Sequence, residues 1–510
     1  KWVAVDVKDH RSYIAGKSKK IYLTSELNKP FYAERAEVEF TDAGVLQLND
    51  AIQLSHYYRM LQHLGFATEE AIGGIIGREE RIIWHHLNEK IYKDVTNNSY
   101  FSPLEHYDRE FDLRIKIAKG ARIGKILSEP LWGSDCGSCE FRTVCKDELK
   151  EKDHITLLPG ITPNLTATFY KYNIKKIIQI ARLSHKSARL ATLVNLEDIS
   201  QKISIHPKDE LISNIVDEKI SSILLSEGIK TVKDFQKLDL KIAGLSNDYN
   251  KSLPDLIDQA RSFITNKVLL PRGKSYVDLS RAHVEEDIDI EDDNGFVYLI
   301  GVNTTIRSIQ GDNKSVNSTY YSFVTWDRTD EAEAKVFADF WAHIQNSKNQ
   351  ALKKRKKNAY MAYHFHTHER TAFVRLAEKH AGKTGVPNKD EVINFIDSEY
   401  FQDMHKVLTS QLIWPTPAKT LKELAKWARF SWRDSDPGGG NSLAWYEKAI
   451  NSTDDYELQE NRDRLLDYNA DDVAAQIHLR NWLSRLSDDS KLPGSRILNA
   501  KELEKRFNSK

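Results

Sequence analysis

All cysteines of this chain lie in one short stretch, and their spacing limits what that segment can do. Residues 135–145 read DCGSCEFRTVC and contain Cys136, Cys139 and Cys145, the three cysteines of the protein. Three cysteines cannot build a disulfide framework, which favours a reducing, cytoplasmic location. Metal sites built from thiolates commonly use four ligands. The sequence therefore predicts a thiolate-bound metal site that needs a fourth ligand from outside the stretch.

Zinc and unligated thiols are the alternatives for these cysteines. Zinc sites usually contain two close pairs of ligands, and the second pair is absent here, although His154 lies downstream and could complete a site. A separate zinc site is conceivable at HFHTH, where His364, His366 and His368 alternate and would share one face of a strand.

Composition excludes a membrane protein and a generally basic nucleic-acid coat. The 510 residues are enough for about two to four domains. Lys and Arg number 74, as do Asp and Glu, so the formal net charge is zero. A local basic run, KKRKK, stands at 353–357. No apolar run approaches the ~18–20 residues that a membrane-spanning helix needs.

Changes in sequence character predict a multidomain α/β protein with a tail. Residues 1–150 begin on a strand, KWVAVDVK, which is followed by a helix and the apolar strand AIGGIIG. Residues 151–270 read as helical. In residues 271–488 the strands SYVDLS, GFVYLIGVNTT and TYYSFVT precede alternating helix and strand, which indicates a mixed sheet. Residues 489–510 read as a charged, poorly anchored tail, and the acidic run EEDIDIEDD at 285–293 as an exposed hairpin connection.

The helical segment contains a weak internal repeat. LTATFYKYNIKKIIQIARL at 165–183 aligns with ISSILLSEGIKTVKDFQKL at 220–238, and each copy reads as a helix, a tight turn and a second helix. With the turn LLPGI at 157–161, this resembles the helix-hairpin-helix motif, in which backbone N–H groups hold a phosphate without reading bases. A small helical packing domain is the alternative.

Two short patterns in the first domain place polar side chains together. Asp6 and Lys8 are two apart on a predicted strand, so both face the same way. Gln53 and Tyr57 are one helical turn apart. A carboxylate beside a lysine can hold a divalent metal ion and orient its water.

The order Asp-x-Lys, Gln-x-x-x-Tyr and Cys-x2-Cys-x5-Cys resembles the RecB-type nucleases of the PD-(D/E)xK superfamily, most closely the subgroup with an iron–sulfur cluster. The resemblance implies a 4Fe-4S cluster on the three cysteines and a fourth cysteine upstream of residue 1. It also implies that the first metal-binding Asp and the front of the domain precede residue 1. Of the family's motif residues, this chain contains matches at Asp6, Lys8, Gln53 and Tyr57. The resemblance implies that Asp6 is a metal ligand.

A second set of acidic residues is spread over the C-terminal domain. Asp278 stands on the predicted strand YVDLS, Glu369 at a strand-to-helix junction, and Tyr468 and Asp472 four apart on one helical face. Carboxylates on a sheet and two helices are what a two-metal phosphodiesterase needs. A tyrosine one turn before the last Asp can position the attacking water.

This region resembles the ribonuclease H-like 3′–5′ exonucleases with a DEDD metal set, in the tyrosine-containing form. More closely, the whole chain resembles a nuclease family with a RecB-type domain, helix-hairpin-helix segments and a ribonuclease H-like domain. The resemblance implies Mg²⁺ or Mn²⁺ bound by Asp278, Glu369 and Asp472. The family's first motif is Asp-x-Glu, often with a further Asp, and this alignment puts Ser280 and Ala282 at the second and third positions. We therefore expect a C-terminal site that is weakened or altered.

These observations predict a metal-dependent exonuclease that acts on DNA in repair, recombination or a related process. The alternative is a catalytically weakened relative that serves as a nucleic-acid-binding scaffold, and a ribonuclease directed at RNA is a third possibility. No Walker motif is present, so unwinding would need a helicase partner.

Overall fold

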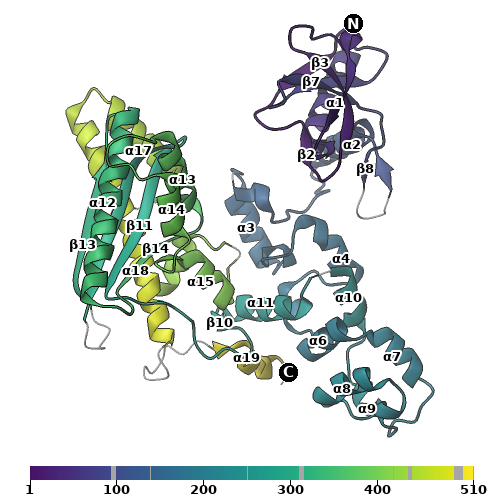
Figure 1. The fold of residues 1–510 in the computed structure, drawn as a ribbon. Coiled ribbons are helices and arrows are strands. Elements are labelled where there is room, and N and C mark those ends of the chain that lie inside the picture. Colours follow the sequence, from purple (N-terminus) through teal and green to yellow (C-terminus); the bar gives the residue numbers. More distant parts are fainter. Residues whose placement is uncertain are drawn as a thin grey trace. The chain divides into compact units, whose positions relative to one another are not determined.

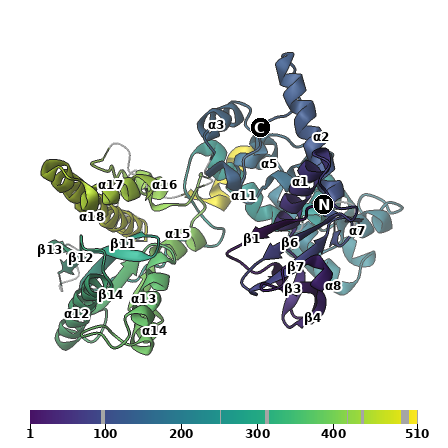
Figure 2. The ribbon, with the colours of Figure 1, turned by 90° about the horizontal axis from the view of Figure 1, so that it is seen from above.

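The computed structural model describes residues 1–93, 99–137, 139–249, 251–308, 315–416, 418–434, 439–487 and 498–508. The chain forms two compact units, Lys1–Pro130 and Leu131–Lys510 (Figure 1, Figure 2). The expected boundary at residue 150 therefore lies inside the second unit, and the cysteine segment groups with the residues that follow it. None of the described helices is both long and apolar enough to cross a membrane.

A five-stranded sheet covered by helix α1 forms the centre of the first unit. The strand order is β1-β6-β7-β3-β4, in which β1 and β6 run parallel and the other neighbours antiparallel. Helix α1, Leu48–His63, lies so close to β6 that a Cβ at Gly73 would be 2.9 Å from Leu54 Cδ2. The predicted strand, helix and apolar strand at the start of the chain are thus confirmed. The strands are β1 Ala4–Val7, β3 Lys20–Glu26, β4 Ala36–Phe40, β6 Ile72–Ile76 and β7 Arg81–His86.

Smaller elements complete this unit. Strands β2, Tyr13–Ala15, and β5, Ala43–Leu46, pair with each other, as do β8, Tyr92–Lys93, and β9, Tyr100–Phe101. The 3₁₀ turn η1 spans Tyr32–Glu34. Helix α2, Pro103–Arg122, begins at a capping box formed by Ser102 and Glu105, which satisfies two backbone N–H groups.

Short helices form the start of the second unit, as the sequence predicts. In the first repeat, α4 (Thr166–Lys171) and α5 (Ile177–Ala181) flank Asn173 at φ 59°, and in the second, α8 (Glu218–Ser226) and α9 (Val232–Phe235) flank Gly228 at φ 72°. The predicted helix, turn and helix are therefore present in both copies. The other helices here are α3 Arg142–Glu151, α6 His185–Leu193, α7 Leu196–Ile203, α10 Lys241–Tyr249 and α11 Leu253–Thr265, with 3₁₀ turns η2 Ser134–Gly137, η3 Ile155–Leu157, η4 Pro163–Leu165 and η5 Ile212–Asn214.

The C-terminal part is a mixed five-stranded sheet between two helical layers (Figure 2). The order is β13-β12-β11-β14-β15; β11, β12 and β13 are antiparallel, and β14 and β15 run parallel to β11. Helices α12, α13 and α14 bury one face, and α17 and α18 cover the other. The bounds are β11 Val284–Asp293, β12 Phe296–Arg307, β13 Ser315–Val324, α12 Asp330–Lys354, β14 Tyr360–His364, α13 His368–Lys379, α14 Lys389–Ile396, β15 Phe401–Asp403, α15 Met404–Gln411, α16 Leu421–Ala425, η6 Lys426–Ala428, α17 Gly439–Asn451 and α18 Asp455–Ser487.

The acidic run at 285–293 is the central strand β11, and its prediction as an exposed connection is wrong. The connection to β12 is instead the two-residue turn Asn294–Gly295, with φ of 50° and 89°, which matches the twist of the hairpin. The predicted strand at 275–280 is also wrong, because those residues lie outside every strand.

Part of the predicted tail is anchored. Strand β16, Leu498–Asn499, pairs with β10, Leu269–Leu270, and the Leu503 side chain on helix α19, Ala500–Asn508, is fully buried. The expectation of a poorly anchored tail is therefore wrong for residues 498–508, and residues 489–497 lie outside the described part.

Candidate active site

Strand β11 carries the first two carboxylates of an acidic cluster in the C-terminal domain. Ile288 and Ile290 point into the core, so the alternating Asp289 and Glu291 point to the opposite face, toward α18. Helix α18 adds Asp472. One carboxylate oxygen from each of the three acids lies within 4.8 Å of the others.

Glu369 lies in the first turn of α13, is 2% exposed and is not one of the three acids grouped within 4.8 Å. Its Oε2 is 3.4 Å from Nδ1 of the buried His364 and has no hydrogen-bond partner. The negative charge of Glu369 helps to raise the pKa of Asp289, which places the two carboxylates in one electrostatic environment.

Side chains spaced along α18 fix its position over β11. Asn469 Nδ2 donates to Asp289 Oδ2 at 2.8 Å, and Gln476 Nε2 donates to the Ile288 carbonyl at 3.0 Å. Further along, the fully buried Arg480 pairs with Asp287 and Glu285. These contacts set the rotation of the helix that places Asp472 next to Asp289 and Glu291.

Asp472 is also contacted by Trp432 and Lys422, which precede α17 in the chain. Trp432 Nε1 donates to Asp472 Oδ1 at 2.6 Å, and Lys422 Nζ lies 3.8 Å from Asp472 Oδ2. Lys422 also donates to the Tyr468 hydroxyl. Tyr468 is 4% exposed and packs edge-on against Trp445 at 5.7 Å between ring centroids.

Residues 286–484 match the family model of the RNase H superfamily. The C-terminal domain is ribonuclease H-like. This result confirms the predicted fold of this domain and is consistent with a nuclease-type function. No curated protein and no solved structure gave a significant match to the chain.

The electrostatics of this ribonuclease H-like site show that its carboxylates are poorly satisfied by the protein alone. Burial, reinforced by the charge of Asp472, raises the pKa of Glu291 to about 8. Burial also raises the pKa of Asp472, and burial with the neighbouring acids raises the pKa of Asp289 well above its usual range. An all-oxygen donor set of this kind suits Mg²⁺ or Mn²⁺, whose charge would favour the ionised carboxylates. The residues present therefore fit the metal ions that such domains generally use.

Asp278 is not part of this site, contrary to the sequence prediction. It is exposed, and its backbone N–H and carbonyl group bond to the side chain of Gln411 at 2.7 Å each. The Asp-x-Glu motif that was aligned to Asp278 and Ser280 lies at Asp289 and Glu291, with Asp293 two residues further on. The expectation of a depleted carboxylate set is therefore wrong: the pair is present on a different segment.

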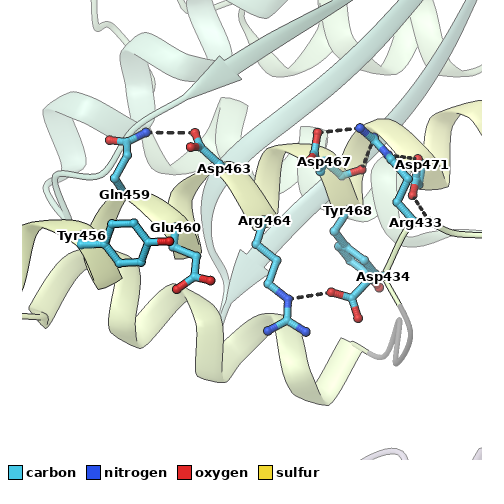
Figure 3. A pocket seen from close by; sticks show the side chains of 10 residues that line it. All are labelled: Arg433, Asp434, Tyr456, Gln459, Glu460, Asp463, Arg464, Asp467, Tyr468 and Asp471. Atoms are coloured by element: carbon cyan, nitrogen blue, oxygen red, sulfur yellow. Dashed lines mark hydrogen bonds and ion pairs between the residues drawn. The ribbon is translucent and has the colours of Figure 1, made fainter.

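Asp472 joins the cluster and its neighbour Asp471 does not, because Asp471 is bound by Arg433 on another face of α18. A cavity of about 450 Å³ lies on this face and is lined by Tyr468 and mainly charged residues (Figure 3). There Arg433 binds Asp471 with its backbone N–H at 2.7 Å and its Nε at 2.8 Å, and binds Asp467 Oδ1 at 2.6 Å. Asp471 thus serves an ion pair, whereas Asp472 faces the carboxylates of β11.

In the first unit, the four residues singled out from the sequence are linked by one ion pair and two hydrogen bonds. Lys8 Nζ lies 2.9 Å from Asp6 Oδ2 and donates to Gln53 Oε1 at 2.6 Å. Gln53 Nε2 in turn donates to the Tyr57 hydroxyl at 2.6 Å. The hydrogen bond and the charge of Asp6 raise the pKa of Lys8, which keeps its ammonium group protonated.

Asp50, which the sequence reading missed, lies next to this chain. It is 4% exposed, and its Oδ1 is 4.0 Å from Lys8 Nζ and 3.6 Å from His10 Nε2. Burial raises the pKa of Asp50, and its Oδ2 has no hydrogen-bond partner. Its position in the first turn of α1 was readable from the sequence, but nothing there shows its approach to Lys8.

The three cysteines, and the histidines singled out from the sequence, form no metal cluster among the described residues. Cys136 and Cys145 are partly exposed and Cys139 is exposed, and the three sulfur atoms do not approach one another as a ligand set would. His154 is engaged by Thr156 and Tyr170. Strand β14 ends at His364, so the expected single face for His364, His366 and His368 is wrong.

Proposed function

We propose that the C-terminal domain is a metal-dependent nuclease that removes nucleotides from DNA. The observation that carries this proposal is the cluster of the half-buried Asp289 with the buried Glu291 and Asp472 in a ribonuclease H-like domain, with Glu369 of α13 in the same electrostatic environment. A nuclease domain implies nucleic-acid binding. DNA as the substrate, the 3′–5′ direction and a role in repair or recombination rest on the resemblance of the whole chain to multidomain nucleases.

In this proposal the residues of the site divide into metal ligands, a tyrosine that orients water and side chains that hold the ligands in place. Asp289, Glu291, Glu369 and Asp472 would hold Mg²⁺ or Mn²⁺, which supplies stabilisation of the attacking and leaving oxygens of the phosphodiester. The Tyr468 hydroxyl orients the attacking water. Asn469 holds Asp289 in place, and Trp432 fixes one oxygen of Asp472 so that the other stays directed at the cluster.

The first unit supports a second candidate nuclease site. Its support is the continuous chain from Asp6 through Lys8 and Gln53 to Tyr57. In a RecB-type site Asp6 would bind the metal ion and Lys8 would orient the attacking water, with Gln53 and Tyr57 holding Lys8. Asp50 is an additional carboxylate within reach of the same ion.

The remaining features complete the proposal for the whole chain. An iron–sulfur cluster on Cys136, Cys139 and Cys145 and phosphate contacts at the helical repeats rest on resemblance alone. A cytoplasmic location rests on the small number of cysteines, and a helicase partner on the missing Walker motif. The alternative of a weakened nuclease that serves as a scaffold was motivated by Ser280 and by the first domain's incomplete motif set. Only the first of these grounds does not apply to the pair Asp289 and Glu291.

Degradation of end-labelled single-stranded DNA and RNA with Mn²⁺ tests both sites. Glu291→Gln removes one carboxylate from the C-terminal site, Asp6→Asn removes one from the first unit, and the double variant removes both. The proposal expects Glu291→Gln to abolish most of the metal-dependent loss of label from DNA. If Asp6→Asn alone abolishes it, the activity belongs to the first unit; if every variant equals the wild type, neither site is a nuclease.

A further inference from the structure

Lys422 is placed by a short, well-anchored helix at the edge of the carboxylate cluster. Helix α16 begins at Leu421 and is capped by Thr420, whose side chain accepts a hydrogen bond from Glu423 N at 3.3 Å. Leu424 and Ala425 on the opposite face are fully buried against the β14, α15 and α18 core. Lys422 therefore approaches Tyr468 and Asp472 from a fixed backbone, with 28% of its side chain exposed.

The ammonium group contacts both functional groups of α18 at once. It donates to the Tyr468 hydroxyl and lies 4.5 Å from the centroid of the Tyr468 ring. It also lies 3.8 Å from Asp472 Oδ2. One ammonium group therefore joins the Tyr468 hydroxyl to the Asp472 carboxylate.

Lys422 is also the cation that the cluster has in the absence of metal. Among the described residues, no other basic side chain forms an ion pair with Asp289, Glu291 or Asp472. The other side chain that donates to Asp472 from this segment, Trp432, is neutral. Buried carboxylates at such short range repel one another, so a single positive charge at their edge stabilises the folded, metal-free state.

We propose that Lys422 is a positioning residue that serves as the resident counter-cation of the cluster: it holds the Tyr468 hydroxyl and Asp472 in their catalytic arrangement and competes with divalent cations for the Asp472 carboxylate. This inference rests on the proposed function of the C-terminal domain. The counter-cation role makes a prediction that a purely structural role does not make. Removal of the Lys422 charge should strengthen metal binding and, at the same time, slow DNA degradation.

Mn²⁺ titration of the full chain in an Asp6→Asn background, which removes the candidate ligand of the first unit, tests the inference without relying on activity. Calorimetry or the paramagnetic signal of the free ion follows the binding. In Lys422→Met, loss of a positive charge near the ion lowers the apparent dissociation constant of Mn²⁺ by about tenfold. The rate of DNA degradation at saturating Mn²⁺ falls by about tenfold, because the Tyr468 hydroxyl loses the partner that orients it. Lys422→Arg retains the charge and binds Mn²⁺ within about threefold of the wild type.

Lys426→Met is the matched control, since Lys426 lies just after α16, is 62% exposed on its side chain and pairs with Glu423. It leaves both the affinity and the rate unchanged. Weaker or unchanged Mn²⁺ binding in Lys422→Met, with a rate that falls, overturns the counter-cation role. A failure of the proposed function gives a different result. In that case the wild type and Asp289→Asn bind Mn²⁺ equally poorly, and no variant changes the rate of DNA degradation.

Discussion

Asn469 on α18 and Asp289 on β11 are joined by a 2.8 Å hydrogen bond directly above Gly301, the residue opposite Asp289 on β12. The Asn469 amide oxygen accepts from the Tyr320 hydroxyl at 2.8 Å, so the amide is fixed from both ends. A Cβ at residue 301 would lie 1.7 Å from this oxygen. The absence of a side chain at 301 is therefore what allows α18 to reach the carboxylates.

Gly301→Ala is expected to displace Asn469 and with it the alignment of Asp289. We expect a loss of about 1–3 kcal/mol in the free energy of unfolding and a large loss of metal-dependent activity, because the added methyl group has no room. Denaturant unfolding and the DNA degradation assay measure the two effects.

A double-mutant cycle separates the clash from a general weakness of β12. In an Asn469→Ala background the closest clash at Gly301 is gone and the Tyr320 hydroxyl, at 2.9 Å, remains. The added methyl group should then cost well under half of its effect in the wild type. Equal costs in the two backgrounds would show that Asn469 is not the group that Gly301 accommodates.

Arg480→Met is expected to be severely destabilising. Arg480 is fully buried between Asp287 and Glu285, which are fully buried as well. Removal of the guanidinium leaves the buried Asp287 without its ion-pair partner, whereas Glu285 keeps its pair with Arg281. The loss of the Asp287 partner costs about 3–5 kcal/mol. The exposed pair Lys335–Asp339 is the comparison, and Lys335→Met should change stability by less than about 1 kcal/mol. If Arg480→Met and Lys335→Met lose similar amounts of unfolding free energy, the ion pairs of Arg480 do not anchor α18.

His85 should make the first unit less stable at acidic pH. Burial, with a smaller contribution from His86, lowers the pKa of His85 from 6.5 to about 4. Between these values the unfolded chain binds a proton that the folded protein does not, so stability is complete above pH 6.5 and falls as the pH drops toward 4. At pH 5 the loss relative to pH 7 is about 2 kcal/mol.

Hydrogen exchange of peptides from β6 and β7 in the full chain, corrected for intrinsic rates, measures this loss. His85→Phe removes the titrating group and should flatten the dependence between pH 5 and 7. If the variant and the wild type lose protection in parallel, another group is responsible.

Divalent cations should stabilise the C-terminal domain through its carboxylates. An ion that binds only the folded state at a concentration 100 times its dissociation constant contributes about 2.7 kcal/mol. Mn²⁺ should therefore raise the unfolding temperature of the wild type, and EDTA should reverse the rise. Glu291→Gln should show a much smaller rise, and an equal rise would place the bound ion elsewhere.

Residue spacing within one helix or strand was enough to predict those site residues that lie on the same helix or strand. Glu369 at a strand-to-helix junction, and Tyr468 and Asp472 one helical turn apart, stand where their spacing indicated. The chain from Asp6 to Tyr57 follows in the same way from a period of two on a strand and of four on a helix.

Long-range partners decided the part that the sequence reading missed. A run of acids appears exposed, but in β11 these side chains are buried because Arg480, Asn469 and Tyr360 reach them from distant positions. The alternation of Ile288 and Ile290 with acids was the available signal for a strand. YVDLS has a similar local pattern, but no neighbouring strand pairs with it.

Comparison of Asp289→Asn with Asp278→Asn tests the central claim most directly. Both are measured for Mn²⁺-dependent degradation of end-labelled DNA, in an Asp6→Asn background that silences the first unit. The account predicts a loss of about 100-fold or more for Asp289→Asn, and for Asp278→Asn a rate within about twofold of its parent. A loss in Asp278→Asn with full activity in Asp289→Asn would contradict the placement of the catalytic carboxylates on β11.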